Sequence, residues 1–534
     1  MSKKWIALAL VIAMMLSLAA CGGSQTPKET TEPTQASEAA QTEQTPTEAQ
    51  ETATPTATTT KETLTIALPV EPATLDPFAH SNQNGFICTS LVLEPLIKKN
   101  DDGELIPWLA TSWEYVDDTT LHFTLRDDVT FQDGSKFTAK DVKFSLSKLA
   151  QSSFTSTFFQ CIDYENITVE DDYNLTVKLL YTYAPLLEAL ATLRAGMVSE
   201  DIYNEMGADA FARNPVGTGP MKFSRWVTGD RIEMEAYDGY WGEAPAFKKF
   251  VARVIVEASS RTIELETGGV DIAFELAAAD WNRIDENPET QLISGNTQGI
   301  SYLCLNNSLA PIAGNENLRK ALAYGLNLEA LVKAVWQGTA DVADSYYSPT
   351  IMGHKTIGPR EYDPEKAKEL LAEAGFPDGL DVTYMTYESA VNLAFAEVLQ
   401  NMWGQIGVNV TIQFLDLATF TQMNNAGEIT MALMTNTASI PDPAAALIAW
   451  PTSRTISLRH GDSHIDELLQ KGQQTYDETE RIAIYEELQD YLWDRTYTIP
   501  IAFPKGAYGA RANVANLPFY PDLMPDMTRV QFVG

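Results

Sequence analysis

The stretch that most constrains the fold is residues 105–149, where a strand, a turn and a helix are each specified by their own residues. Across residues 120–126 apolar side chains alternate with polar ones, so they share one face of a half-buried strand. Asp133-Gly134 supplies a turn. Thr138, followed three residues later by Asp141, predicts a capping box with an apolar helical stripe behind it. The sequence therefore predicts strand, turn and capped helix in that order.

The residue motifs of this stretch identify a protein family as well as a local structure. Three motifs follow one another: Leu-Ala-x-Ser-Trp at 109–113, Phe-x-Asp-Gly at 131–134 and Phe-Thr-Ala-x-Asp-Val at 137–142. Together they resemble the signature of the family 5 solute-binding proteins, the peptide, dipeptide and nickel-type receptors of bacterial ABC importers. The resemblance covers nearly all of residues 64–534. It implies a binding protein rather than an enzyme.

The resemblance also implies a fold. The expectation is an α/β protein with a two-lobed, periplasmic-binding-protein-like architecture of class II and an additional domain inserted in the first lobe. The first lobe would hold residues 63–97, 214–300 and 499–534, the inserted domain 98–213, and the second lobe 301–498. The chain would cross between the lobes on strands at 301–306 and 497–503. The ligand would make contacts that exist only in the closed state, so it would shift the population towards that state. The closed form would then dock on the permease and ATPase subunits of the importer.

Hydrophobic periodicity predicts several helices outside the first stretch. The ranges are 86–97, 318–335, 363–375 and 391–407. The helix at 363–375 has proline in its first turn and glycine after its end, which is the expected punctuation.

The first residues predict an exported protein with a lipid anchor. Lys3 and Lys4 precede an apolar run at 5–20 that is short for a membrane span of ~20 residues and has the charged start of a secretory signal. Residues 18–21, Leu-Ala-Ala-Cys, resemble a lipobox in which the Cys21 thiol receives a diacylglycerol. An ordinary signal peptide that contains a cysteine is the alternative. We therefore expect a signal peptide at 1–20 and a lipid-anchored protein on the extracytoplasmic face of the bacterial cell membrane, with the envelope type left open.

Residues 21–62 are expected to be a disordered tether. After the cysteine they are nearly all Thr, Glu, Pro, Gln, Ser and Ala, which bury too little apolar area to offset the entropy of ordering.

Charge and cysteine content narrow the function classes. The formal net charge is −35 at pH 7, which argues against nucleic-acid partners because phosphates would be repelled.

Cys88, Cys161 and Cys304 lie in apolar runs. Three cysteines allow at most one internal disulfide, so at least one is expected to be a buried thiol, and three small core residues are favoured.

Catalysis has little support in the sequence. There is no Gly-x-Ser-x-Gly elbow and no His-Glu-x-x-His motif, and the chain has five histidines. Paired acids such as Asp117-Asp118 and Asp171-Asp172 stand at expected turns, where solvated carboxylates are usual. No cofactor and no enzyme activity are expected.

One loop resembles the ligand loop of the peptide-binding members. Those members have Trp-x-x-Asp-x-x-Asp-Pro, in which the first acid takes the peptide's amino group, and the matching stretch here is residues 436–443. Asp442 and the following proline match, but Asn436 stands for the tryptophan and Ser439 for the amine-binding acid. A hydroxyl offers a neutral hydrogen bond where an ammonium prefers a charge. Asp442 is more often a helix cap than a ligand contact.

Other candidate ligand residues come from the nickel-type and dipeptide-type members. Arg194 aligns with an arginine that holds the carboxylates of a metal chelator, and a structural salt bridge is the equal alternative. The resemblance places His80, Asn84 and Phe86 in the ligand-facing loop of the nickel type. Dipeptide-type members have an arginine for the ligand carboxylate just after a strand that corresponds to residues 380–385 here, and this chain has Glu388 in that place. Glu388 could contact a cationic group of a ligand, and a solvated loop acid is the alternative.

Two further pairs of residues could contact a ligand or a metal ion. Tyr346 and Tyr347 are candidates for stacking on a ligand, with packing as the more common role of such pairs. His460 and His464 stand four apart, but they straddle a loop end, so no metal site is expected.

These observations predict a lipid-anchored receptor of an ABC importer that binds a small peptide or peptide-like solute as a monomer. The alternatives are a nickel or metal-chelate receptor of the same family and a sensory lipoprotein with the same fold.

Overall fold

The computed structural model describes residues 61–100, 102–446 and 462–534. The expected signal peptide, Cys21, nearly all of the tether and His460 lie outside the described residues. None of the helices in the described ranges is both long and apolar enough to cross a membrane.

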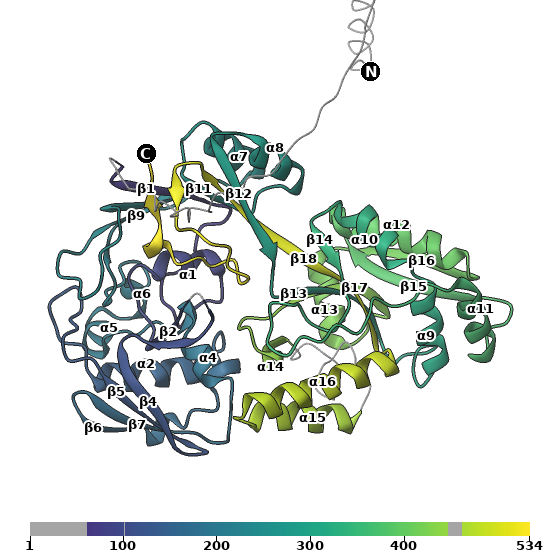
Figure 1. The fold of residues 1–534 in the computed structure, drawn as a ribbon, viewed down its shortest axis with the longest axis horizontal. Helices are drawn as coiled ribbons and strands as arrows, with labels where there is room; N and C mark the ends of the chain where they lie inside the picture. The colour runs from purple at the N-terminus through teal and green to yellow at the C-terminus, as the bar shows by residue number, and fades with distance from the viewer. Residues whose placement is uncertain (1–60, 101, 447–461) are drawn as a thin grey trace, which may run out of the picture. The chain divides into compact units, whose positions relative to one another are not determined.

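A ten-stranded sheet forms the frame of the described chain (Figure 1). Its strands are β1 (Thr63–Leu68), β8 (Met221–Val227), β9 (Arg231–Ala236), β10 (Lys249–Val254), β11 (Ile272–Phe274), β12 (Thr290–Asn296), β13 (Gly299–Leu305), β14 (Ala340–Val342), β17 (Met431–Thr437) and β18 (Thr498–Arg511). The main path is β17-β13-β18-β11-β1-β10-β9-β8, and β12 and β14 also pair with β18. β1 runs parallel to β10 and β11, whereas β18 is antiparallel to all four of its neighbours.

The strand β18, drawn in yellow in Figure 1, joins the two parts of this sheet. Its residues 498–502 pair with residues 301–304 of β13, and its residues 505–511 pair with residues 290–296 of β12. The strands predicted at 301–306 and 497–503 are thus hydrogen-bonded neighbours. Together with the solved structures described below, this arrangement agrees with a two-lobed fold.

The stretch at 105–149 folds as its residues predict. β5 (Thr120–Leu125) buries its alternate apolar residues, and α2 (Ala139–Gln151) follows the turn. The backbone N–H of Thr138 donates to Asp141 Oδ2 at 2.9 Å, which is one half of the predicted capping box. β5 lies in a four-stranded antiparallel sheet of order β4-β5-β7-β6. Its other strands are β4 (Ala110–Asp117), β6 (Thr168–Asp171) and β7 (Asn174–Lys178).

The other elements before residue 300 and after β18 are short helices and strands. They are α1 (Gln83–Thr89), β2 (Ile97–Lys99), β3 (Leu105–Pro107), α3 (Ser156–Phe159), η1 (Tyr164–Asn166), α4 (Leu186–Leu190), η2 (Leu193–Ala195), α5 (Glu200–Met206), α6 (Ala208–Phe211), α7 (Ala258–Glu266), η3 (Ala278–Asp280), α8 (Trp281–Glu286), β19 (Val514–Ala515), η5 (Met527–Arg529) and β20 (Gln531–Phe532).

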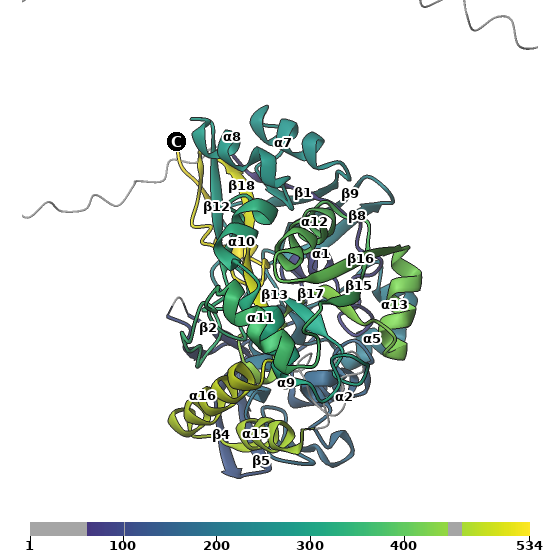
Figure 2. The ribbon, with the colours of Figure 1, turned by 90° about the vertical axis from the view of Figure 1, so that its right-hand side faces the viewer.

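The remaining elements are mainly helices, together with a parallel strand pair. These elements are α9 (Glu316–Tyr324), α10 (Leu328–Trp336), α11 (Pro364–Glu373), β15 (Leu380–Tyr387), α12 (Ala390–Gly404), β16 (Val408–Leu415), α13 (Leu417–Ala426), α14 (Pro443–Ala446), α15 (Ser463–Gln474) and α16 (Glu478–Arg495). α15 and α16 lie side by side in both views (Figures 1 and 2).

Two large apolar cores hold these elements. The first runs from β1 and α1 through the four-stranded sheet to α15 and α16, and the second is enclosed by α9–α12, β15 and β16. Cys88, Cys161 and Cys304 are buried thiols, which agrees with the expected core role.

The helix predicted at 86–97 is wrong in its extent, because α1 ends at Thr89. The carbonyls of Leu91 and Val92 accept hydrogen bonds from Met221 and Gly219 instead of continuing the helix. A Cβ at Gly219 would lie 2.6 Å from the carbonyl oxygen of Leu91, so the two backbones approach this closely only because the residue is glycine. Tertiary hydrogen bonds therefore override the helical period.

The helix predicted at 318–335 is two helices. α9 ends at Tyr324, Gly325 follows, and Asn327 caps α10 by accepting a hydrogen bond from the N–H of Ala330. The glycine and the cap divide an otherwise continuous apolar pattern.

Glu94 is a buried carboxyl surrounded by hydrogen-bond donors. Its side chain accepts from Trp108 Nε1 at 2.9 Å, Tyr240 Oη at 2.7 Å, Trp241 Nε1 at 2.9 Å and Thr218 Oγ1 at 2.8 Å. Burial raises the pKa of Glu94, and the donors oppose this rise because they favour the ionised form. The carboxyl group ties three distant segments to the chain that leaves α1.

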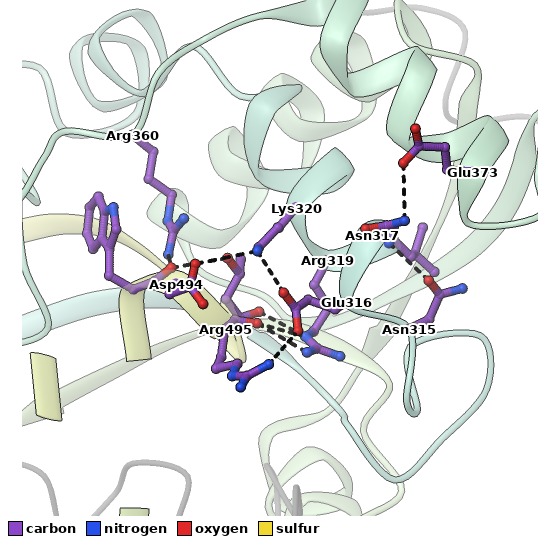
Figure 3. A network of polar contacts seen from close by, with 12 residues as sticks. Asn315, Glu316, Asn317, Arg319, Lys320, Arg360, Glu373, Asp494 and Arg495 are labelled. Carbon is purple, nitrogen blue, oxygen red and sulfur yellow. Dashed lines mark hydrogen bonds and ion pairs between the residues drawn. The ribbon is translucent and has the colours of Figure 1, made fainter. Parts of the chain in front are cut away.

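The last turn of α16 is held by charged side chains of α9 (Figure 3). The buried guanidinium of Arg319 donates to the carbonyls of Arg495 and Thr496. Glu316 accepts from Arg495 at 3.0 Å and from Lys320 at 2.7 Å. A cation beside the last carbonyls stabilises a helix end. These contacts fix the point at which the chain enters β18.

We expect Glu94→Ala to lower the free energy of unfolding by about 3 kcal/mol or more, because it leaves one buried and three half-buried donors without an acceptor. Urea unfolding followed by circular dichroism measures the change. Glu114→Ala, which removes an exposed glutamate from β4, is the matched control and should cost less than about 0.5 kcal/mol. Equal stability of the two variants would show that the four contacts to Glu94 contribute nothing net.

Candidate binding cavity

A cavity of about 630 Å³ collects residues that are far apart in the sequence. His80, Arg194 and Ser439, which the sequence singled out separately, all line it. Its walls come from the loop before α1 and the start of that helix, the segment after α2, η2, the end of β17 with the loop after it, and the C-terminal segment. The full lining is Ala73, Ala79, His80, Ser81, Asn82, Gln83, Phe154, Arg194, Thr437, Ala438, Ser439 and Asp522.

Arg194 brings a positive charge to this cavity. Its guanidinium lies over the ring of Phe86, 4.9 Å from the centroid, and Nη1 donates to the carbonyl of Ser81 at 3.4 Å. Nε is buried, and no described residue accepts from it. Burial lowers the pKa of Arg194, and the nearby Asp522 opposes this effect, but no ion pair within 4.0 Å joins Arg194 to a carboxylate of the described chain. The site thus offers a cation with donors available to an anion.

His80 lies beside Arg194 as a buried, neutral imidazole. Its Nδ1 accepts from the backbone N–H of Asn82 at 3.2 Å, which leaves Nε2 as the protonated nitrogen of the neutral ring. Burial, together with the charge of Arg194, lowers the pKa of His80 to about 4. Nε2 is buried without an acceptor among the described residues. The ring packs on Phe86 at 4.3 Å between centroids, and a Cβ at Gly85 would lie 2.6 Å from His80 Cε1.

The loop after β17 carries Ser439 to the cavity and is held from behind by a buried ion pair. Asp442 is 1% exposed and accepts from Arg481 Nη2 at 3.0 and 2.9 Å. Asp442 also accepts from the N–H of Ala444, so it caps α14 as the sequence favoured. Asn436 donates to the carbonyl of Ala446 at 2.8 Å and is therefore engaged with the same loop.

The remaining sequence candidates do not line this cavity. Tyr346 and Tyr347 are fully buried, and their hydroxyls donate to the carbonyls of Leu492 and Gly353, which is a packing role. Glu388 is exposed at the end of β15. Asn84 is buried in α1 and lines a neighbouring cavity. His464 lies near Glu487, and no group of residues suited to a metal ion occurs in the described part of the chain.

Among the lining residues that sequence reasoning missed are Gln83, Phe154 and Asp522. Gln83 Nε2 donates to the backbone carbonyl of Asp522 at 2.8 Å, a contact across 439 residues. Nothing local in the sequence indicates it, because it depends on the return of the C-terminal segment to α1.

Comparisons with known proteins agree with this architecture. A family model described as "Bacterial extracellular solute-binding proteins, family 5 Middle" matches residues 104–457. The chain is 29% identical over 502 residues to the nickel-binding periplasmic protein of Escherichia coli strain K12, covering 86% of this chain and 92% of that protein. It is 26% identical over 466 residues to the glutathione-binding protein of Salmonella paratyphi A, covering 84% and 90%.

A solved structure is similar over almost the same span. It is the ABC transporter-associated periplasmic binding protein DppA of Helicobacter pylori in complex with the peptide STSA. The TM-score is 0.73 with 25% identity, covering 88% of this chain and 98% of that chain.

The lowered pKa of His80 predicts a pH dependence of stability. The unfolded chain binds a proton near the ordinary value of 6.5, whereas folded His80 stays neutral down to about pH 4. The free energy of unfolding should therefore fall by about 3 kcal/mol as the pH drops from 7 to 4 on account of this residue. Urea unfolding at several pH values measures it.

His80→Phe keeps a ring and removes the titration, so its stability should fall less steeply over the same range. His464→Phe, at a half-exposed position, should follow the wild-type slope. If the free energy of unfolding of His80→Phe fell with pH as steeply as that of the wild type, the pH dependence would not come from His80.

Proposed function

This chain belongs to the family 5 bacterial extracellular solute-binding proteins, and we propose that it binds a small anionic peptide or peptide-like solute and delivers it to an ABC permease. The family membership supports a binding role rather than a catalytic one. The proposal of an anionic ligand depends on the guanidinium of Arg194, which lines the cavity. Its Nε is a buried hydrogen-bond donor for which no described residue is the acceptor.

A carboxylate is the ligand group that suits this arrangement. Arg194 forms a planar fork that matches a carboxylate, and a charge-assisted bond is stronger where water is excluded. His80 adds a neutral N–H donor, and Ser439 adds a hydroxyl. The absence of an acid at position 439 favours a ligand whose recognition depends on its carboxylate and backbone more than on an ammonium group.

A nickel or metal-chelate ligand is the second candidate. The relative with 29% identity is named as nickel-binding, and an arginine beside an imidazole would suit the carboxylates of a chelator. The structure with a bound peptide supports the first candidate. A sensory protein with the same cavity would bind the same ligand without a partner permease.

The proposal includes a lipid anchor and a monomeric receptor. Cys21 would carry the lipid, residues 21–62 would span the distance to the membrane, and residues 98–213 would be the domain inserted in the first lobe. Two or more acyl chains give stable anchoring where a single chain is marginal.

Native mass spectrometry of the purified protein, followed by denaturation, should release a peptide or peptide-like anion. Isothermal titration with that molecule should show binding weakened by about 2 kcal/mol or more in Arg194→Ala, roughly 30-fold, because a desolvated charge-assisted bond is lost. Arg225→Ala, at an exposed position of β8, should bind like the wild type. Release of nickel with an organic acid would select the second candidate, and unchanged affinity in Arg194→Ala would remove this residue from the site.

Cys21→Ala should move the protein from the membrane fraction to the soluble extracytoplasmic fraction. Metabolic labelling with palmitate should mark the wild type and leave the variant unlabelled. Cys161→Ala, which removes a buried thiol instead, should remain labelled. A labelled, membrane-bound Cys21→Ala variant would contradict the anchor.

A further inference from the structure

A second cavity, of about 260 Å³, adjoins the first. Gln83 lines both, and Asp522 in the first cavity is followed directly by Leu523 in the second. The hydrogen bond from Gln83 to the carbonyl of Asp522 therefore lies at the boundary between them. The second cavity is lined by Gln83, Asn84, Ile87, Phe274, Glu275, Leu276, Trp281, Lys505, Gly506, Ala507, Tyr508 and Leu523.

The walls of this second cavity are mostly apolar. Ile87, Phe274 and Leu276 are buried core residues that nevertheless face open space. The charge of Lys505 is neutralised by Asp341 at 2.7 Å, and the hydroxyl of Tyr508 donates to the carbonyl of Pro518. The apolar side of this lining favours an apolar group, while Gln83, Asn84, Glu275 and Lys505 add polar groups to it.

One polar group in the lining has no partner. Trp281 Nε1 is buried, and no described residue accepts its hydrogen. A buried donor without an acceptor is costly, so buried indole N–H groups usually have a partner. A ligand carbonyl that reached Trp281 would satisfy it.

The backbone beside this cavity is held in an unusual conformation. Glu275 and Leu523 have φ of +48° and +59°, a region that residues with a side chain seldom adopt. The guanidinium of Arg261 secures one of these turns by donating to the carbonyls of Phe274 and Glu275. Backbone held in this way is typical of ligand sites, where it fixes the shape of a wall in advance.

We propose that the second cavity receives an apolar side chain of the ligand while Arg194 holds the ligand's carboxylate in the first. The ligand is then a short peptide with a Leu-, Met- or Phe-like residue at a fixed distance from its carboxyl terminus, and a ligand carbonyl accepts from Trp281. This inference rests on the proposed function. A compact metal chelate would occupy the first cavity and leave the second without an apolar occupant.

The test is selection from a synthetic pool of dipeptides and tripeptides. Purified protein is incubated with the pool, and the retained peptides are released and sequenced by mass spectrometry. Peptides with Leu, Ile, Val, Met or Phe at one fixed position should be enriched at least about tenfold over those with Ser or Asp there, because the apolar side chain leaves water.

Two variants address the second cavity alone. Ala507→Leu fills it from β18 and should abolish the apolar enrichment while peptides are still retained through Arg194. Ala418→Leu, the same change at an exposed position of α13, should keep the enrichment. Trp281→Phe keeps a ring and removes the N–H, so the enriched peptides should bind about fivefold more weakly in calorimetry.

The outcomes separate the two levels of the proposal. Retained peptides without an apolar preference, or an unchanged preference in Ala507→Leu, would overturn the role of the second cavity and leave the proposed function standing. Equal affinity in Trp281→Phe would overturn the hydrogen bond to Trp281. A pool from which nothing is retained, or retention that Arg194→Ala does not reduce, would overturn the proposed function together with the inference.

Discussion

The buried carboxyl group of Glu94 joins segments that are far apart in the sequence around the chain that leaves α1. A carboxylate out of water must be surrounded by donors, and its donors come from the segments at 108, 218 and 240–241. The backbone of the same residue accepts from the N–H of Met197, so it also holds the chain just after η2. Gly196 adds a close approach, since a Cβ there would lie 2.8 Å from Leu93 Cβ. The chain just after Arg194 is thus held by the backbone of Glu94, a residue that does not line the cavity.

Local sequence was sufficient where local interactions decide the structure. The strand, turn and capped helix of residues 105–149 are specified by alternation, by Asp133-Gly134 and by the contact of Thr138 with Asp141. It was insufficient where backbone groups bond to distant segments, as after α1, where the carbonyls of Leu91 and Val92 are used by the chain near residue 220. The family resemblance, rather than periodicity, predicted the two-lobed fold and the two crossing strands, which the structure shows to be the paired strands β13 and β18.

The cavity, too, has residues that the sequence indicates and residues that only distant contacts reveal. His80, Arg194 and Ser439 were identified separately from sequence, and the structure brings all three to one cavity. For Tyr346 and Tyr347 the sequence favoured packing over ligand stacking, and the contacts around α16 show that both rings are enclosed. Asp522 and Gln83 gave no signal, since their contact joins the C-terminal segment to α1.

The cavity lining lies largely in connecting segments rather than in the sheet that supports them. His80 precedes α1, Ser439 follows β17, and Asp522 stands in the segment after β19, so none of the three belongs to a strand of the frame. Such a separation between scaffold and recognition makes the fold readily evolvable. It gives a physical reason why one ancestral frame can diversify into receptors for chemically unlike solutes, as the names of the nickel-binding and glutathione-binding relatives record.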